Sequence, residues 1–318
     1  MTDVRAHSSR VRTVFLGTGG FGKESFRRLD DHPDVQLVGV VTAPPRPAGR
    51  KQRLTGSVIS SVADELGVKS ILMPERLRDP ESISAVLALE PDLLVLADYG
   101  QIVPEPLLGL RHGALNLHPS VLPRHRGATP IPATILAGDA ETGVTLMRMD
   151  AGLDTGPIVA QERMALDGSE TAPGLEEVLM MVADGLLDRS LGPWIRGEIV
   201  ARQQLSEGAS VTRPLERGDG RLDPSSRAVE LWRQVRAYQP WPGSFVSTPF
   251  GRLVVWKASV RPMTGVVPGR FAIDGLDTVD GRLLLHEVQP AGGKRMPWDA
   301  FVRGHPGIVG SAAVASDS

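Results

Sequence analysis

Three polar residues in one stretch of the chain have types and spacing suited to acyl transfer. Asn116 and His118 lie two residues apart in the run ALNLH, which alternates between apolar and polar as a β-strand does. A strand places both side chains on one face. Asp154 follows in a loop between Gly152 and Gly156. An amide, an imidazole and a carboxylate at strand ends can bind an oxyanion and move a proton, which is the chemistry of acyl transfer.

Each of these residues also has an ordinary structural role open to it. Asn116 could cap a turn, His118 could be a hydrogen-bonded histidine at a strand end, and Asp154 could be a simple turn acid. The three together, in this order, favour catalysis. A metal site formed by His112, His118 and His125 is a weaker alternative, because separations of six and seven residues match no helical ligand motif.

Length and composition predict a globular protein of two domains. The chain has 318 residues, 41% hydrophobic and 23% charged, and domains average roughly 150 residues. No segment approaches the roughly 20 apolar residues of a membrane span, and the N-terminal MTDVRAHSSRVR has no apolar run typical of a secretory signal. The chain has no cysteine, which excludes disulfides, thiolate nucleophiles and Cys-ligated zinc. We therefore expect a cytoplasmic enzyme.

The charge of the chain is nearly balanced but unevenly distributed. The net charge is −2, which does not indicate bulk binding of nucleic acid. Residues 201–318 carry 15 Lys and Arg against 11 Asp and Glu, hence +4, whereas residues 1–200 carry −6. A mildly basic second half is compatible with a polyanionic partner, but on charge alone chance variation is the favoured explanation.

Strands and helices alternate through the first half of the chain. This order predicts an α/β domain with a Rossmann-like, mostly parallel sheet, whose ligands lie beyond the carboxyl ends of the strands. The segment Gly17–Gly22 matches the G-x-G-x-x-G dinucleotide fingerprint between a strand and a helix. The second strand, Val35 to Val41, is followed by Thr-Ala-Pro-Pro and no acid. We therefore expect a tight turn there and no NAD site.

The second half of the chain indicates a small β-rich domain. A helix is expected over residues 227–238, and several short β-like runs separated by Gly and Pro follow it, as in a small barrel. We expect a catalytic domain over residues 1–196, a linker over 197–211, a second domain over 212–310 and a disordered tail over 311–318.

An ordered set of short motifs in this chain resembles those of the formyltransferases that use 10-formyltetrahydrofolate. The motifs are Asn116-x-His118, Ser120–Pro123, Arg126-Gly127-Ala128, Gly138-Asp139 with Thr142–Thr145, and Leu153–Gly156. The resemblance extends from Arg12 to Gly304 and is closest to the members that formylate methionyl-tRNA. It implies a formyltransferase domain followed by an OB-like β-barrel domain that binds tRNA.

The resemblance also implies a role for each site residue. Asn116 would donate a hydrogen bond to the formyl oxygen, and His118 would act as a second donor or as a proton shuttle. Asp154 would hold His118 and take a proton from the incoming ammonium. The formyl donor would be 10-formyltetrahydrofolate, with no metal and no NAD. Folate contacts are expected, largely through the backbone, at Tyr99, Gly100, Ser120, Val121, Leu122 and Pro123.

A basic segment gives the best indication of the acceptor. Residues 44–53 contain four basic residues and no acid, and their Pro and Gly content argues against a helix. By composition alone the segment is a solvated surface loop. The resemblance implies instead a loop that contacts the acceptor stem of initiator methionyl-tRNA, in an enzyme that we expect to be a monomer. The residues expected to contact tRNA are Arg46, Arg50, Lys51 and Arg53, with Lys294 and Arg295 in the second domain.

The chain departs from the family pattern at two places near the expected site. It has Gly19-Gly20 where relatives usually have Pro and an acid, and Asp98 where they usually have Ala. Two other functions stay open. One is a related enzyme that formylates an amino sugar or glycinamide ribonucleotide, or hydrolyses formyltetrahydrofolate. The other is a non-catalytic RNA-binding relative.

Overall fold

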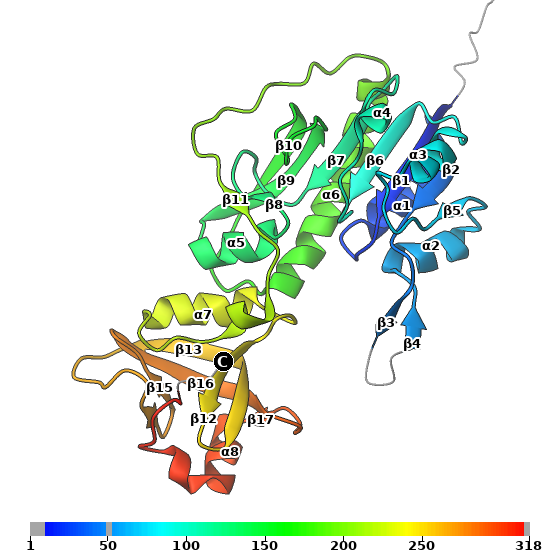
Figure 1. The fold of residues 1–318 in the computed structure, drawn as a ribbon. Coiled ribbons are helices and arrows are strands. Elements are labelled where there is room, and N and C mark those ends of the chain that lie inside the picture. The colour runs from blue at the N-terminus through cyan, green and yellow to red at the C-terminus, as the bar shows by residue number, and fades with distance from the viewer. Residues whose placement is uncertain (1–9, 49–52, 315–318) are drawn as a thin grey trace, which may run out of the picture. The chain divides into compact units, whose positions relative to one another are not determined.

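The computed structural model describes residues 10–48 and 53–314. Arg50 and Lys51, two of the expected tRNA contacts, lie outside the described residues. The chain divides into two compact units, coloured blue to green and mainly yellow to red in Figure 1. The first unit comprises Met1–Pro130, Glu141–Ala165 and Glu176–Thr212, and the second comprises Ile131–Ala140, Leu166–Leu175 and Arg213–Ser318.

Two short segments expected in the first domain belong to the second unit. The segment 131–140 contains most of α5 (Pro130–Ala137), and Nη1 of Arg233 donates a hydrogen bond to its Ala137 carbonyl. The segment 166–175 contains the start of α6 (Ala172–Ile195), and Nη1 of Arg236 donates to the Glu170 carbonyl. These long-range contacts, which local sequence patterns do not reveal, attach both segments to the second unit.

A seven-stranded sheet forms the first unit, and its mostly parallel character confirms the expected fold class. The strand order is β10-β9-β7-β6-β1-β2-β5. The pairs β1–β2, β1–β6, β2–β5 and β6–β7 are parallel, and β9 is antiparallel to both of its neighbours. The strands are β1 (Val11–Gly17), β2 (Val35–Val41), β5 (Ile71–Leu72), β6 (Leu93–Ala97), β7 (Ala114–His118), β9 (Glu141–Arg148) and β10 (Ile158–Ala165).

Helices cover both faces of this sheet and pack on it through apolar side chains. Successive side chains of a strand point to opposite faces. Val14 and Leu16 of β1 accordingly join a buried cluster that includes Val86 of α3 (Pro80–Leu87) and Leu107 of α4 (Glu105–Leu108). Phe15 between them stacks on Phe26 of α1 (Lys23–Asp31), with ring centroids 4.8 Å apart. The helix α2 (Val58–Leu66) packs against α1 and is capped by the Ser57 side chain.

The glycine-rich segment after β1 is the expected strand-to-helix turn. The strand ends at Gly17, and Gly22 caps the first turn of α1. A Cβ added to Gly19 would lie only 1.7 Å from Oδ2 of Asp98, which follows β6. The carboxylate of Asp98 therefore occupies the space that a side chain at position 19 would need. Two positions that depart from the family pattern, Gly19 and Asp98, therefore lie against each other.

Two short paired strands, which we call the hairpin, include the described residues 46–48 and 53 of the basic segment, where the sequence predicts a loop. The strands β3 (Arg46–Ala48) and β4 (Arg53–Thr55) pair antiparallel. The side chains of Arg46 and Arg53 are exposed, and that of Leu54 is 73% exposed.

A mainly antiparallel sheet with two helices packed on it forms the second unit. The sheet order is β12-β13-β16-β15-β14, and β17 also pairs with β16. The long strands β13 and β16 bend strongly (Figure 1). Apolar residues of α7 (Ala228–Ala237) and α8 (Trp298–Gly304) pack with the sheet in one core. The strands are β12 (Ser244–Thr248), β13 (Gly251–Pro262), β14 (Phe271–Ala272), β15 (Gly275–Asp277), β16 (Gly281–Pro290) and β17 (Met296–Pro297).

The remaining elements are short. They are β8 (Arg126–Gly127), β11 (Val211–Thr212) and the 3-10 turns at Arg217–Gly220 and Pro306–Ile308. Residues 311–314, where the sequence predicts the start of a disordered tail, are hydrogen-bonded to the second unit through Ala313 and Val314. None of the helices in the described residues is long and apolar enough to cross a membrane.

The pairing of Gly19 with Asp98 can be tested by a double-mutant cycle. Gly19→Ala forces the Asp98 carboxylate to move, and we expect a loss of stability of about 1–3 kcal/mol. Asp98→Ala removes the obstacle, so the double variant should lose less than Gly19→Ala alone. The measurement is urea unfolding of the full chain. Gly109→Ala is the control, because a Cβ at Gly109 meets no atom within 4 Å. Simple additivity of the two changes would contradict the pairing.

Candidate active site

The strand β7 presents Asn116 and His118 on one face. Leu115 and Leu117, which alternate with them, are at most 1% exposed on the other face. Burial of these leucines fixes the register of the strand, so the two polar side chains must point to the site. Asn116 is partly exposed, and its amide makes no hydrogen bond to any residue that the structure describes. Its two N–H donors are therefore available to a ligand.

His118 is buried, and each of its ring nitrogens faces a different group of the protein. Nε2 lies 2.9 Å from the His125 carbonyl oxygen, and Nδ1 lies 3.7 Å from Oδ2 of Asp154. A carbonyl oxygen can only accept, so Nε2 must carry the hydrogen. Nδ1 of the neutral ring then has a lone pair that faces the Asp154 carboxylate.

Burial controls the protonation of this histidine. Burial lowers the pKa of the His118 imidazole, while the negative charge of Asp154 and the hydrogen bond to His125 act in the opposite direction. The net direction is downward, so the ring is neutral at pH 7. A neutral ring with a free Nδ1 lone pair can accept a proton.

Asp154 lies in the loop between β9 and β10. One of its carboxylate oxygens is hydrogen-bonded to the protein, and the other is open. Oδ2 accepts a hydrogen bond of 2.7 Å from the Gly127 backbone N–H. Oδ1 makes no hydrogen bond within the described part of the chain. Gly127 has φ +97°, and a Cβ added to it would lie 2.4 Å from the Thr212 carbonyl oxygen. Only glycine fits this position, which brings the Gly127 N–H to the carboxylate.

Backbone strain is concentrated at the same place. Asp98, His125 and Asp154 have φ values of +53°, +57° and +51°. Glu90 is the other non-glycine residue with positive φ within residues 10–48 and 53–314. Left-handed conformations cost energy for residues with a Cβ and cluster at functional sites. Two of the three residues, His125 and Asp154, face the ring nitrogens of His118.

Two hydrogen bonds of the Thr145 hydroxyl fix the loop Ser120–Pro123, where folate is expected. Oγ1 of Thr145 donates to the Ser120 carbonyl and accepts from the Leu122 N–H, at 2.7 and 3.1 Å. The side chains of Ser120 and Leu122 are buried, whereas those of Val121 and Pro123 are partly exposed. Ser120 and Leu122 can therefore offer a ligand little more than backbone atoms.

Asp98 and Tyr99 follow the central strand β6, and a second acid, Glu176, lies in α6. Tyr99 is partly buried, its hydroxyl makes no hydrogen bond within the described part of the chain, and burial raises its pKa to about 12. Gly100 next to it is exposed. Asp98 is exposed as a residue, but desolvation of its carboxyl group raises its pKa. Burial together with the charge of Asp98 raises the pKa of Glu176. Glu176 approaches Gly20, where relatives usually carry an acid, so this edge of the site is acidic.

Residues 202–211, expected in the linker, and Thr212, expected in the second domain, take part in building the site. The strand β11 pairs with β8, and Ser210 accepts a hydrogen bond from the His125 N–H through Oγ at 2.9 Å. Oγ1 of Thr212 accepts a hydrogen bond from the Thr129 backbone N–H and donates one to the Arg126 carbonyl. These two bonds hold the backbone on both sides of Gly127. The polar, loop-like composition of this segment gave no sign of these contacts in the sequence.

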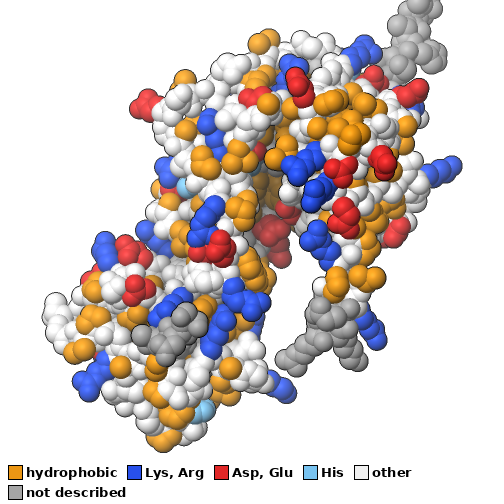
Figure 2. All heavy atoms as spheres, in the orientation of Figure 1, with side chains coloured by type: hydrophobic (Ala, Val, Ile, Leu, Met, Phe, Trp, Pro, Cys, Tyr) orange, Lys and Arg blue, Asp and Glu red, His pale blue; other side chains and the backbone are white. Residues whose placement is uncertain are grey.

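Four of the six basic residues expected to contact tRNA lie in the described part of the chain, and all four are exposed. Arg46 and Arg53 are exposed on the hairpin, and Lys294 and Arg295 are exposed on the turn between β16 and β17. Arg295 stacks over the Trp256 ring at 3.5 Å from its centroid. Figure 2 shows acidic and basic side chains interspersed on the visible face of the first unit.

No group of three or more acids and histidines within the described residues is placed to hold a metal ion.

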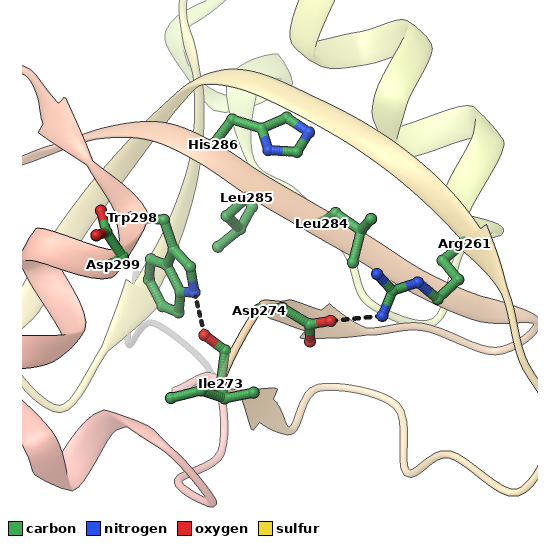
Figure 3. A pocket seen from close by; sticks show the side chains of 8 residues that line it. All are labelled: Arg261, Ile273, Asp274, Leu284, Leu285, His286, Trp298 and Asp299. Atoms are coloured by element: carbon green, nitrogen blue, oxygen red, sulfur yellow. Dashed lines mark hydrogen bonds and ion pairs between the residues drawn. The ribbon is translucent and has the colours of Figure 1, made fainter.

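A cavity of about 370 Å³ in the second unit lies beside Trp298, Asp274 and Arg261 (Figure 3). Its polar groups are already paired, since the Trp298 indole donates to the Ile273 carbonyl and Asp274 binds Arg261. None of the expected site residues lines this cavity.

Known proteins resemble this chain over nearly its full length. Residues 11–188 match the formyl transferase family, and residues 214–306 match the formyl transferase C-terminal domain. The methionyl-tRNA formyltransferase of Myxococcus xanthus is 40% identical over 309 residues, covering 95% of this chain and 98% of the relative. The enzyme of the same name from Roseiflexus sp. is 39% identical, covering 92% of each chain.

A solved structure shares the fold. It is the N-formyltransferase of Helicobacter canadensis in complex with folinic acid and dTDP-3-aminofucose, with a TM-score of 0.62 and 16% identity. The match covers 90% of this chain and all of that one. The family match, the identity to full-length relatives and the shared fold agree, and the chain belongs to the formyl transferase family.

Proposed function

We propose that this chain transfers the formyl group of 10-formyltetrahydrofolate to the α-amino group of methionyl initiator tRNA, for translation initiation in the cytoplasm. The observation that carries the proposal is the grouping of a free amide, a neutral imidazole and an open carboxylate. They belong to Asn116, His118 and Asp154, with His118 Nδ1 3.7 Å from Asp154 Oδ2.

The amide of Asn116 is suited to stabilise the transition state. Attack of an amine on a formyl carbonyl makes a tetrahedral intermediate with negative charge on its oxygen. A preorganised N–H donor at that position lowers the barrier, and loss of one such donor costs about 10²–10³ in rate. Asn116 has unpaired donors on a rigid central strand.

His118 and Asp154 supply the route for the proton. An α-amino group has a pKa of about 8, so much of the acceptor arrives as ammonium and must lose a proton before it attacks. Oδ1 of Asp154 is open, and Nδ1 of His118 lies beside Oδ2 with a lone pair. Nε2–H of His118 is engaged by the His125 carbonyl, which favours the role of proton shuttle over that of oxyanion donor. The proton finally passes to N10 of the leaving tetrahydrofolate, so no covalent enzyme intermediate is needed.

The folate would lie against the loop Ser120–Pro123 and the residues Tyr99 and Gly100. The loop is rigid because Thr145 and Gln161 fix its carbonyl groups, so its backbone can present a preformed surface. Tyr99 offers a hydroxyl without a partner in the described residues. A ligand that bonds this hydroxyl would satisfy a buried polar group.

The acceptor is proposed from the likeness to full-length relatives named methionyl-tRNA formyltransferase and from two features of the chain. One is the exposed hairpin with Arg46 and Arg53, and the other is the second unit with its exposed Lys294 and Arg295. Exposed Arg and Lys side chains neutralise phosphates. We further propose that the enzyme acts as a monomer.

The direct test is formylation of methionyl initiator tRNA by the purified chain with 10-formyltetrahydrofolate. Efficient transfer that is absent with elongator methionyl-tRNA would support both the reaction and the acceptor. Binding of folate without transfer to tRNA, together with transfer to an amino sugar nucleotide, would replace the proposed acceptor with a small amine.

Replacing Asp154 by Asn should abolish most of the transfer while the fold survives. The amide keeps the shape of the side chain and can still accept from Gly127, but it cannot take a proton. General-base catalysis contributes about 10²–10⁴-fold, and we expect kcat to fall by that amount. The measurement is single-turnover formylation, with Asp188→Asn on the exposed side of α6 as control. Near-normal turnover of the Asp154 variant would remove this carboxylate from the mechanism.

Replacing Arg46 and Arg53 by Ala should weaken tRNA binding specifically. Each lost phosphate contact should raise the KM for tRNA several-fold and reduce the salt dependence of binding by about one unit of slope. The KM for folate should not change. Arg78→Ala, also at an exposed arginine of the first unit, is the matched control. If the tRNA KM of the hairpin variant equals that of the control, the hairpin has no part in binding tRNA.

A further inference from the structure

We propose that Gln204 is a positioning residue that holds the Asp154 loop in its reactive conformation. Gln204 lies in the segment expected to be a linker, seven residues before β11. The inference rests on the proposed function, because it gives Gln204 a part in formyl transfer by Asp154.

The side chain of Gln204 joins two loops of the site. Nε2 donates to the carbonyl oxygens of Asp154 and Gly156, at 2.8 and 2.7 Å. Oε1 accepts from Nε and Nη2 of Arg126, at 3.1 and 2.7 Å. Every hydrogen-bonding group of this amide is therefore occupied by the two loops.

The partners leave the Gln204 amide one possible orientation. Carbonyl oxygens only accept and a guanidinium only donates. A flipped amide would place oxygen against the carbonyls of Asp154 and Gly156, and NH₂ against the Arg126 guanidinium. The amide is thus a specific connector, which a carboxylate or an apolar side chain of the same length cannot replace.

These bonds complete a closed set of contacts around the Asp154 carboxylate. Arg126 holds Gln204, Gln204 holds the backbone of Asp154, and Gly127, next to Arg126, donates its N–H to Asp154 Oδ2. Asp154 has φ +51°, a conformation that persists only where the surroundings enforce it. Anchoring of its carbonyl by Gln204 supplies that restraint, and it keeps Oδ2 close to His118 Nδ1.

Loss of this restraint on Asp154 should change both the rate of formyl transfer and the pKa of His118. A displacement of about 1 Å in a reacting group can lower the rate about 10²-fold. The charge of Asp154 raises the pKa of His118 against the effect of burial. If Asp154 moves away, this contribution shrinks and the pKa of His118 falls further. The acid limb of the kcat profile should therefore move to lower pH.

The test compares Gln204→Met with Gln203→Met. Gln203 is exposed, and its side chain makes no contact of this kind in the described chain, so the same substitution one residue away is a matched control. We expect Gln204→Met to lower kcat about 10–100-fold with KM values for folate and tRNA within about threefold of wild type. NMR titration should show a lower His118 pKa in Gln204→Met than in Gln203→Met.

A third variant, Gln204→Glu, separates orientation of the loop from simple tethering. Its carboxylate keeps the contact with Arg126 but cannot donate to the two carbonyls. We expect it to lose activity as Gln204→Met does, and wild-type activity in this variant would overturn the proposal. Equal kcat and equal His118 pKa in Gln204→Met and Gln203→Met would also overturn it, as would a fall in melting temperature with no change in that pKa. The NMR readout needs no substrate, so it tests Gln204 even if the chain fails to formylate tRNA.

Discussion

The hydrogen bond from Nε2 of His118 to the His125 carbonyl is the interaction on which the site depends. It commits one ring nitrogen to the protein, fixes the tautomer and turns the lone pair of Nδ1 toward Asp154. Burial then keeps the ring neutral. A buried imidazole with its lone pair beside an open carboxylate is a proton acceptor, and the unpaired amide of Asn116 on the same strand face adds an oxyanion donor.

Loops of the first unit hold the groups around this bond in place. The carbonyl of His125 is oriented by a left-handed backbone conformation and by the contact of its N–H with Ser210. The carboxylate of Asp154 is oriented by a second left-handed residue and by the N–H of Gly127. The segment 202–212 contacts both loops. The strained residues are therefore stabilised by contacts between segments distant in the chain, and the central sheet supplies the rigid base.

The sequence predicted the parts of this site that depend on local pattern. Alternation in β7 put Asn116 and His118 on one face, and the order of strands and helices predicted the mostly parallel sheet that the structure confirms. Local patterns could not predict the contacts between segments that are distant in the chain. Nothing local in the sequence says that His125 accepts from His118 or that Gln204 spans two loops. Likewise, nothing local in the sequence says that the carboxylate of Asp98 occupies the space left by the absence of a side chain at Gly19. The hairpin at Arg46 and Arg53 was expected as a loop. Proline and glycine are rare in strands, so the composition of this segment did not indicate its two short strands.

The central claim is that His118 is neutral and carries its hydrogen on Nε2. The most direct measurement is nitrogen-15 NMR of the histidine rings across pH 4–8, with His118 assigned through a His118→Gln variant. The account predicts a protonated Nε2 and an unprotonated Nδ1 at pH 7, with a pKa below the ordinary value of about 6.5 because the ring is buried. A hydrogen on Nδ1 in the neutral ring, or a pKa above that value, would contradict the proposed proton route.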